Sequence, residues 1–156
     1  MTNNCISWDS YFINICLLSA LRSKDPYKKV GCVLVNSEKR IVGVGYNGMP
    51  QGRDDLFTWN KNGKLSSETK YPYVVHAEMN CLLNTTINDL SNCILYTSKF
   101  CCPECLKHII QKGIKYIMYL EDPTDINSED TKASLTMIQK LKIQVQKYSG
   151  PILIKI

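Results

Sequence analysis

Two short motifs in the chain carry side chains that could bind a metal ion and perform chemistry beside it. His76 and Glu78 are separated by one residue in the HAE motif, and Cys102 and Cys105 by two residues in the CPEC motif. Imidazole nitrogen and thiolate sulfur are ligands that Zn²⁺ prefers, and three protein ligands leave one tetrahedral position open, as in catalytic sites. We therefore predict a catalytic zinc site formed by His76, Cys102 and Cys105. Glu78 would stay free to transfer protons.

Each motif is expected to open a helix, which explains why the side chains would meet. The HAE motif begins a run with helical spacing at 76–84, and the CPEC motif begins another at 102–113, directly after a predicted strand at 93–98. Ligands of open α/β sheets bind where strand ends meet helix starts. Cys102 and Cys105 would share one side of the first turn, and a helix N-terminus favours the thiolate form.

Each motif taken alone also has a structural explanation that involves no catalysis. A single histidine at a helix start is more often a packed core residue than a ligand, and a single C-x-x-C also occurs in redox and structural zinc sites. The combination of H-x-E with a later C-x-x-C is the signature of zinc nucleobase deaminases. His108 could be a fourth ligand, which would close the site. Because it lies a full turn deeper in its helix, we expect an ordinary packed or exposed histidine instead.

The elements around the motifs predict an α/β protein in one domain spanning 1–156. Helical spacing over 8–23 predicts a first helix, and two β-branched runs at 30–35 and 41–46 predict a hairpin. Such alternation of strands and helices predicts helices on both faces of a mainly parallel sheet. The other expected elements are a long loop at 47–70, a strand at 115–120, a helix at 131–142 and a last strand from IQVQKY (143–148) or ILIKI (152–156).

Composition limits the class of protein. The net charge is +5, and the excess is spread along the chain, which fits a phosphate-bearing small molecule or weak nucleic-acid contact equally well. No apolar run is long enough to span a bilayer. The stretch INICLLSAL lacks a preceding basic region, so we interpret it as a helix and not as a signal peptide. We therefore expect an intracellular, cytoplasmic protein.

The chain has eight cysteines, and a reducing compartment favours metal binding or burial over disulfides. Three of them cluster around the CPEC motif. Free cysteine is commonly buried, so the isolated ones are expected to fill the core. These isolated cysteines are Cys5, Cys16, Cys32, Cys81 and Cys93.

Beyond the two motifs, the chain resembles the deoxycytidylate (dCMP) branch of the zinc-dependent cytidine and deoxycytidylate deaminase family. The resemblance runs nearly end to end, through LSALRSKDPYKKVGCVLV, IVGVGYNGMPQG, TKYPYVVHAEMN and CPECLKHIIQKGIKYI. It implies a cytidine-deaminase-like fold of three layers, α/β/α, with a mixed sheet of about five strands. It also implies zinc-dependent hydrolysis of dCMP to dUMP, which feeds dTMP synthesis. The implied partners are dCTP as activator, dTTP as inhibitor and further copies of the chain in a homo-oligomer, usually a hexamer, with no nucleic acid and no membrane.

The resemblance also assigns roles to residues. Glu78 would protonate N3 of the cytosine ring and then move a proton to the leaving ammonia, and the backbone N–H of Ala77 would bind the base carbonyl. Asn47 would hold the sugar, although Asn-Gly is also a strong turn dipeptide. Ser98 and Tyr73 would complete the substrate contacts. Tyr71 and Phe100 would line the pocket or belong to the core.

The GYNGMPQG segment resembles the part of the family that binds the regulatory nucleotide. Backbone N–H groups in such a loop can bind phosphates, and the alternative is an ordinary surface loop. Lys28 or Lys29 could add positive charge. The effector residues implied are Lys24, Gly45, Asn47, Gly48 and Gly52.

The chain departs from the family pattern at three places. Cys101 stands where the family has proline, and it could compete for the metal, although the spacing favours Cys102 and Cys105. Lys99 replaces an apolar residue and could reach a phosphate or extend into solvent. The segment 120–130 matches poorly, which leaves strict dCMP preference open and makes a dual dCMP/dCTP deaminase the alternative. A tRNA-adenosine-type deaminase and a structural zinc module are more distant alternatives.

Overall fold

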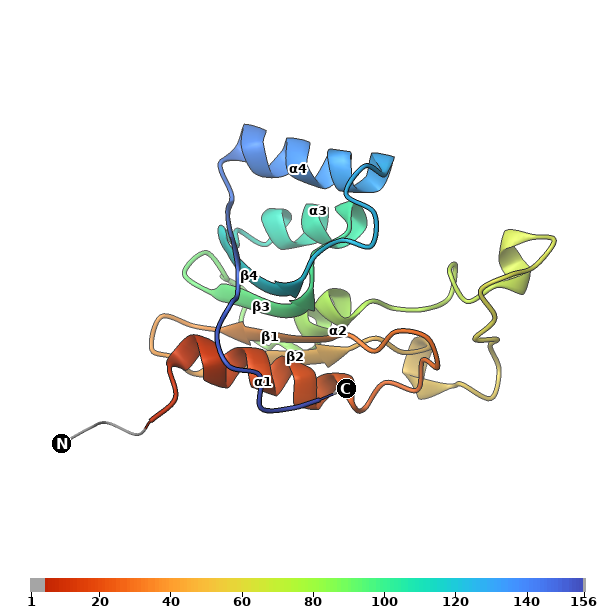
Figure 1. Cartoon of the computed structure of the whole chain (residues 1–156), viewed down its shortest axis with the longest axis horizontal. Helices are drawn as coiled ribbons and strands as arrows, with labels where there is room; N and C mark the ends of the chain where they lie inside the picture. Colours follow the sequence, from red (N-terminus) through yellow and green to blue (C-terminus); the bar gives the residue numbers. More distant parts are fainter. Residues whose placement is uncertain (1–4, 156) are drawn as a thin grey trace.

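A five-stranded sheet forms the centre of the computed structural model, which describes residues 5–155 (Figure 1). The strand order is β2-β1-β3-β4-β5. β1 pairs antiparallel with both β2 and β3, whereas β3, β4 and β5 run parallel. The strands are β1 (Gly31–Val35), β2 (Ile41–Tyr46), β3 (Ile94–Lys99), β4 (Tyr116–Glu121) and β5 (Gln144–Lys147).

The sheet is therefore mixed, as the resemblance implies. β2, β3, β4 and β5 run in one direction and β1 runs opposite to them, so the expectation of a mainly parallel sheet holds for every strand except β1. The antiparallel β1–β2 pair is the predicted hairpin, because the short connection at 36–40 can join only antiparallel strands, whereas a parallel pair needs a crossover of a dozen or more residues. Only the connections that contain α3 and α4 are crossovers between parallel neighbours. The last strand comes from IQVQKY, and residues 151–155 form no strand.

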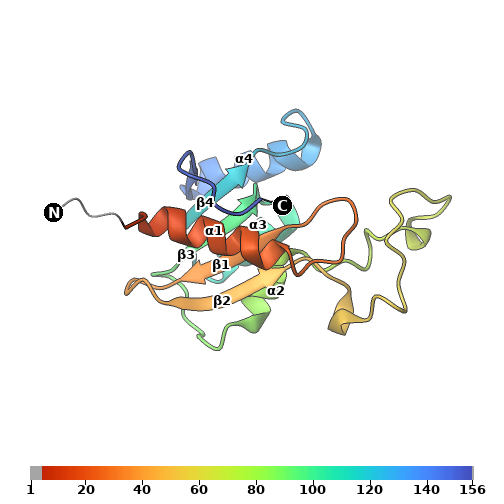
Figure 2. The same ribbon diagram turned by 60° about the horizontal axis from the view of Figure 1, so that its bottom comes forward.

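Within residues 5–155, four α-helices cover the two faces of the sheet unequally (Figures 1 and 2). α1 lies alone on one face, where Phe12 and Ile13 pack with Val33 and Tyr96. On the opposite face, side chains of α2, α3 and α4 belong to one apolar cluster that also includes Cys32 and Leu34 of β1. The helices are α1 (Trp8–Ala20), α2 (Ala77–Asn84), α3 (Pro103–Gln111) and α4 (Glu129–Leu141). This arrangement confirms the three-layer fold.

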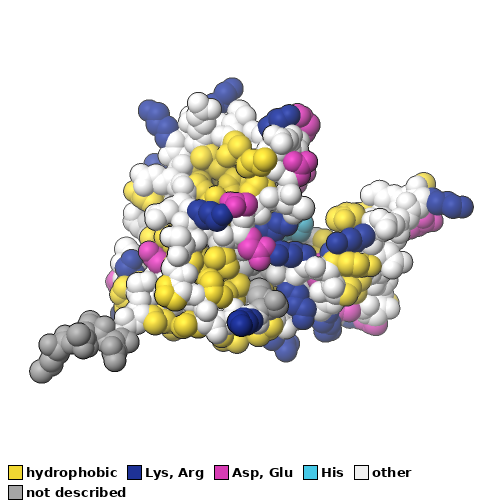
Figure 3. Space-filling view, in the orientation of Figure 1, with side chains coloured by type: hydrophobic (Ala, Val, Ile, Leu, Met, Phe, Trp, Pro, Cys, Tyr) yellow, Lys and Arg dark blue, Asp and Glu magenta, His cyan; other side chains and the backbone are white. Residues whose placement is uncertain are grey.

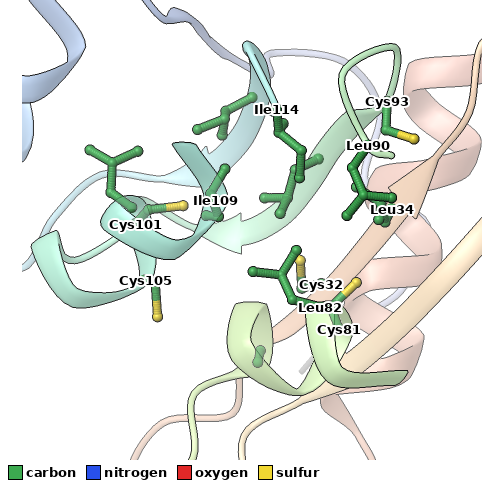
Figure 4. Close-up of a cluster of buried hydrophobic side chains, with 14 of the residues drawn as sticks. Cys32, Leu34, Cys81, Leu82, Leu90, Cys93, Cys101, Cys105, Ile109 and Ile114 are labelled. Atoms are coloured by element: carbon green, nitrogen blue, oxygen red, sulfur yellow. The ribbon is translucent and has the colours of Figure 1, made fainter. Parts of the chain in front are cut away.

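The larger apolar cluster lies between the sheet and α2 and α3 (Figure 4). Alternate residues of a strand point to opposite faces, so β1 contributes Cys32 and Leu34 to this cluster and Val33 to the other. Four of the five isolated cysteines are buried, which confirms their expected role in the core. The exception is Cys5, which is exposed; it lies before α1, outside both clusters.

The segment 47–70 is a long loop, as predicted, and it extends away from the sheet (Figure 2). It contains two short 3-10 helices, Pro50–Gly52 and Ser66–Glu68. A bridge between Gly48 and Val75 fixes both of its ends beside the start of α2. Within residues 5–155, no helix combines the length and the apolar character that crossing a membrane requires.

Candidate active site

The structure brings His76, Cys102 and Cys105 together. His76 is the N-cap of α2, and Cys102 is the N-cap of α3, so both predicted helix starts are confirmed. His76 Nδ1 lies 3.4 Å from the Sγ atom of Cys102 and 3.4 Å from that of Cys105. The potential ligand atoms of the three residues all lie within 4.8 Å of one another. One imidazole nitrogen and two sulfurs at this spacing fit a tetrahedral zinc ion with one position open.

Two local features position these side chains. Pro103 occupies the first turn of α3, where its missing N–H costs nothing. Gly45 of β2 lets α2 approach closely, because a Cβ atom there would lie 2.3 Å from both the Ala77 carbonyl oxygen and the Cys81 nitrogen. The start of α2, with His76 and Glu78, is therefore held against the sheet by the absence of a side chain at Gly45.

The sulfur and imidazole groups shift one another's pKa values. The hydrogen bond with Cys105 and the contact with His76 outweigh burial and together lower the pKa of Cys102 to about 4. The same pairing with Cys102, together with burial, raises the pKa of Cys105, and the contact with Cys102 raises that of His76. The site thus stabilises a thiolate at Cys102, which is the form that binds metal.

Glu78 lies in the first turn of α2 and is only 4% exposed. Burial is the largest cause that raises the pKa of its carboxyl group. The hydroxyl of Thr97 donates a hydrogen bond of 3.3 Å to Glu78 Oε1 and so orients it. Glu78 does not belong to the cluster of possible metal ligands among the described residues. A buried, oriented carboxyl group with a raised pKa is suited to proton transfer.

His76, Glu78 and Cys102 line one cavity of about 220 Å³, whereas Cys105 is not among its lining residues. Of the predicted substrate residues, Asn47 and Ala77 line it, as do the aromatic candidates Tyr71 and Phe100. Ser98 and Tyr73 do not line the cavity. The remaining lining residues are Asp25, Lys28, Val30, Lys70, Val74, His76, Glu78, Lys99 and Cys102.

Ser98 and Tyr73 have other partners. Ser98 is buried in β3, and its hydroxyl accepts a hydrogen bond of 3.0 Å from the Gly31 N–H. The Tyr73 hydroxyl donates to the Ser67 carbonyl at 3.0 Å, and its ring packs against Phe57. Both side chains therefore stabilise the structure around the cavity, Ser98 in the sheet and Tyr73 in the long loop.

Asn47 is 6% exposed, and most of its amide is engaged within the protein. Its Oδ1 accepts a hydrogen bond of 2.8 Å from Val30 N, and its Nδ2 donates to Asp25 Oδ2 at 3.2 Å and to the Lys28 carbonyl at 3.0 Å. Both amide hydrogens are therefore used, and one lone pair of Oδ1 remains to accept a further hydrogen bond. Asn47 thus has a structural role, and the only further hydrogen bond its side chain can make is one that Oδ1 accepts.

Asp25 and Lys70 form a buried ion pair beside Asn47, and sequence reasoning missed it. Their side chains are 2% and 7% exposed. No local pattern could reveal the pair, because the partners are separated by 45 residues. The sequence offers one indication of the pair: Asp25 and Lys70 both lie in segments that resemble the family, LSALRSKDPYKKVGCVLV and TKYPYVVHAEMN.

A second cavity brings together most of the predicted effector residues. Lys24, Asn47, Gly48 and Gly52 line it, along with Arg22 and Asp54. Gly52 has a positive φ of 69°, a conformation that glycine adopts readily. Gly45 is not among the lining residues, since it faces α2. Lys28 lines the first cavity instead, and Lys29 lines neither.

The two rival metal ligands lie outside the cluster found within residues 5–155. Cys101 is buried, and this burial raises the pKa of its thiol, which opposes the thiolate form needed for metal binding. Its backbone carbonyl accepts a hydrogen bond from the Ser134 hydroxyl at 3.1 Å. His108 is exposed on α3, where its Nδ1 lies 2.7 Å from the Glu104 carbonyl oxygen.

Comparisons with known proteins agree with this geometry. The family described as "Cytidine and deoxycytidylate deaminase zinc-binding region" matches residues 6–121. Deoxycytidylate deaminase of Pongo abelii is 47% identical over 83% of this chain and 74% of its own length. The Mus musculus deoxycytidylate deaminase is 42% identical over 92% of this chain and 81% of its own length.

A solved structure shares the fold. The crystal structure of dCMP deaminase from the cyanophage S-TIM5 in complex with dCMP and dUMP matches with a TM-score of 0.69 and 25% identity, over 88% of this chain and 94% of that one. With the family match, the sequence relatives and the His-Cys-Cys cluster all in agreement, the chain belongs to the cytidine and deoxycytidylate deaminase family of zinc-binding enzymes.

Proposed function

We propose that this protein hydrolyses dCMP to dUMP and ammonia with zinc as its cofactor. The observation that carries the proposal is the cluster of His76, Cys102 and Cys105 beside a cavity that the buried Glu78 lines together with His76 and Cys102. Relatives that are 42% and 47% identical are deoxycytidylate deaminases. The combination supports both the chemistry and the class of substrate.

In the proposed mechanism, His76, Cys102 and Cys105 hold the zinc ion, which when bound supplies the Lewis acidity that makes water a nucleophile near neutral pH. Glu78 accepts a proton from the attacking water and delivers it to N3 of the ring. A bond forms between water oxygen and C4 of the cytosine. Glu78 then carries the second water proton to the amino group at C4, the C–N bond breaks, and ammonia leaves.

Other residues of the cavity would orient the substrate. Ala77 is the first residue of α2, where a backbone N–H has no partner inside the helix and can donate to the base carbonyl. Asn47 would accept a hydrogen bond from a sugar hydroxyl with the free lone pair of Oδ1. Thr97 would keep the Glu78 carboxylate aimed at the reacting atoms. Ser98 and Tyr73 would contribute indirectly, through the sheet and the long loop.

The second cavity is proposed to bind a regulatory deoxynucleoside triphosphate, with dCTP as activator and dTTP as inhibitor. Arg22 and Lys24 supply positive charge there, and Gly48 and Gly52 supply backbone without side chains. Asn47 lines both cavities, which supports communication between them. Lys24 is paired with Asp54 at 2.7 Å, so a phosphate would compete with that carboxylate.

A homo-oligomer, with a hexamer as the expected form, is also proposed. Several large apolar side chains of α1 are exposed and would be covered by another copy of the chain. An intracellular location in a reducing compartment is also proposed, in keeping with eight cysteines that form no disulfide within residues 5–155. The exposed apolar residues of α1 are Trp8, Tyr11 and Leu18.

The test is ammonia release from the zinc-loaded protein, offered dCMP, dCTP, CMP or tRNA in separate reactions. We expect turnover of dCMP that rises with added dCTP and falls with added dTTP. Turnover of dCTP itself would favour the dual dCMP/dCTP deaminase. Release of ammonia from tRNA alone, or from none of the four, would refute the proposal.

A further inference from the structure

The mouth of the catalytic cavity carries a group of charges that the proposed chemistry does not use. Lys28 and Lys99 both line the cavity. Lys28 forms an ion pair with Glu121, whose side chain is 42% exposed. Lys99 Nζ donates a hydrogen bond of 2.6 Å to the neutral hydroxyl of Thr124. Figure 3 shows basic and acidic side chains beside a histidine in the hollow between the sheet and the long loop.

Three separate segments bring these charges to one edge of the sheet. Lys99 is the last residue of β3 and Glu121 the last of β4, and the two are paired in the parallel register. Lys28 reaches them from the segment that precedes β1. The carboxyl ends of parallel strands are where α/β proteins bind ligands. The charges therefore stand where one end of a substrate would lie.

The charge balance at the mouth favours an anion. Deeper in the cavity, Lys70 is neutralised by Asp25. At the mouth, two lysines face one carboxylate, and Lys99 has no ion-pair partner among residues 5–155 within 4.0 Å. Burial, and then the charge of Lys28, lower the pKa of Lys99. The charge of Lys28 thus disfavours the charged form of Lys99, and a bound anion would offset this effect.

We propose that Lys28 and Lys99 bind the 5′-phosphate of the substrate and that Glu121 limits the negative charge accepted there, so that a monophosphate is preferred to a triphosphate. This inference rests on the proposed function, which places a cytosine base at the metal end of the same cavity. With the base beside Glu78 and the sugar beside Asn47, the remaining phosphate points to the mouth. These two lysines are the cations that it meets.

In this arrangement the Glu121 carboxylate occupies the position beside Lys28 that the substrate phosphate would take. The Lys28–Glu121 pair is 41% and 42% exposed, so it contributes little to stability and can be exchanged easily. A phosphate dianion offers Lys28 a stronger, charge-assisted partner than the carboxylate does. The further charges of a triphosphate would then lie next to Glu121, which repels them. Glu121 therefore selects by charge, whereas the lysines provide affinity.

The test compares substrates with and without a phosphate in matched variants. We expect Lys28→Met and Lys99→Met each to lower the ratio of kcat/KM for dCMP to kcat/KM for deoxycytidine by about tenfold or more. Deoxycytidine carries no phosphate, so its turnover should stay within about twofold of the native value. Lys115→Met is the control, since Lys115 is an exposed lysine just before the opposite end of β4, and it should leave the ratio unchanged.

Glu121→Gln tests the selective part of the inference. It removes the charge but keeps the shape, and we expect the ratio of kcat/KM for dCTP to that for dCMP to rise roughly three- to tenfold. An unchanged ratio would refute the role of Glu121.

The outcomes separate two failures. An unchanged dCMP-to-deoxycytidine ratio in both lysine variants would overturn the phosphate site while leaving deamination intact. If the native enzyme releases no ammonia from deoxycytidine, this ratio cannot be measured, and KM for dCMP is compared instead. An unchanged KM for dCMP in both lysine variants would then overturn the phosphate site. A native enzyme that turns over no dCMP at all would refute the proposed function itself.

Discussion

At the scale of single residues, Glu78 and His76 show how one helix start can divide two tasks. His76 is the N-cap of α2 and lies at the surface of the cavity, where its ring meets two sulfurs. Glu78 is two residues further along and is buried. Two residues correspond to about 200° of helical rotation, so neighbouring ionisable groups face different surroundings. The spacing in H-x-E therefore separates metal binding from proton transfer.

Glu78→Gln should keep zinc and lose turnover. The amide has nearly the same shape but cannot accept and release a proton, and such proton transfer contributes about 10²- to 10⁴-fold to rates. We expect kcat to fall by that amount with one zinc per chain retained, as measured by ammonia release and by elemental analysis of the same preparation. A variant with more than a tenth of native kcat would show that another group moves the proton.

His76→Ala should lose zinc and activity together. The remaining two sulfurs cannot complete the ligand set, so we expect substoichiometric zinc after dialysis against a weak chelator. His108→Ala is the matched control, because His108 is exposed on α3 and lies outside the cluster. Zinc lost from the His108 variant, or retained in full by the His76 variant, would contradict the ligand assignment.

The pH dependence of substrate binding should report on Lys99. Burial and the charge of Lys28 lower its pKa from 10.5, with Lys61 adding to the effect and Glu121 and Glu78 opposing it. The ammonium is therefore lost at a lower pH than that of an exposed lysine. We expect KM for dCMP to rise with pH already below the pH at which an ordinary exposed lysine loses its proton, because the ammonium that binds the phosphate is lost there. In Lys99→Met this component of the rise should be absent, and identical pH profiles for the two proteins would contradict the phosphate contact.

At the scale of elements, the active site depends on how closely α2 approaches β2. Gly45→Ala should destabilise the protein, since the new methyl group would lie 2.3 Å from backbone atoms of Ala77 and Cys81. Backbone cannot move aside as a side chain can, so we expect a loss of about 1–3 kcal/mol in the free energy of unfolding, measured in urea. Gly48→Ala is the control: a Cβ atom there meets nothing within 4 Å. Equal stability of the two variants would refute the close-approach argument.

The helices and the hairpin could be predicted because each has a local cause. Helical spacing, Pro103 in the first turn and Gly113 after the last turn define α3 within the sequence itself. The direction of β3 relative to β1 has no such local cause. It is set by the whole path through the long loop and α2, so no local pattern could predict that β1 and β3 pair antiparallel.

In the active site, too, features with a local cause in the sequence could be predicted, and features that depend on distant residues could not. The metal-binding cluster could be predicted because both motifs open helices, and a helix start fixes where its first side chains point. Ser98 and Tyr73 were expected to contact substrate, and the structure gives each a hydrogen-bond partner elsewhere. The pairs Asp25–Lys70 and Lys28–Glu121 join residues that are 45 and 93 positions apart, so neither leaves a local pattern.

At the scale of the whole molecule, the Asp25–Lys70 pair connects three distant parts of the chain. Asp25 follows α1, Lys70 ends the long loop, and Asn47 begins that loop and donates to the same carboxylate. Asp25 Oδ1 also accepts from the backbone N–H groups of Tyr27 at 2.9 Å and Lys28 at 3.3 Å. The pair thus holds the long loop against the floor of the catalytic cavity.

Breaking this pair from one side should cost more than removing both charges. Asp25→Asn leaves a buried ammonium and Lys70→Met a buried carboxylate, and either uncompensated charge should lower the free energy of unfolding by about 3–5 kcal/mol. The double variant buries no lone charge, so we expect its loss to be smaller than the sum of the single losses by at least about 1 kcal/mol. Urea unfolding of the four proteins at neutral pH measures this coupling energy. Additive losses would mean that the loop is held by its other contacts, such as the Gly48–Val75 bridge, and that the two charges act independently.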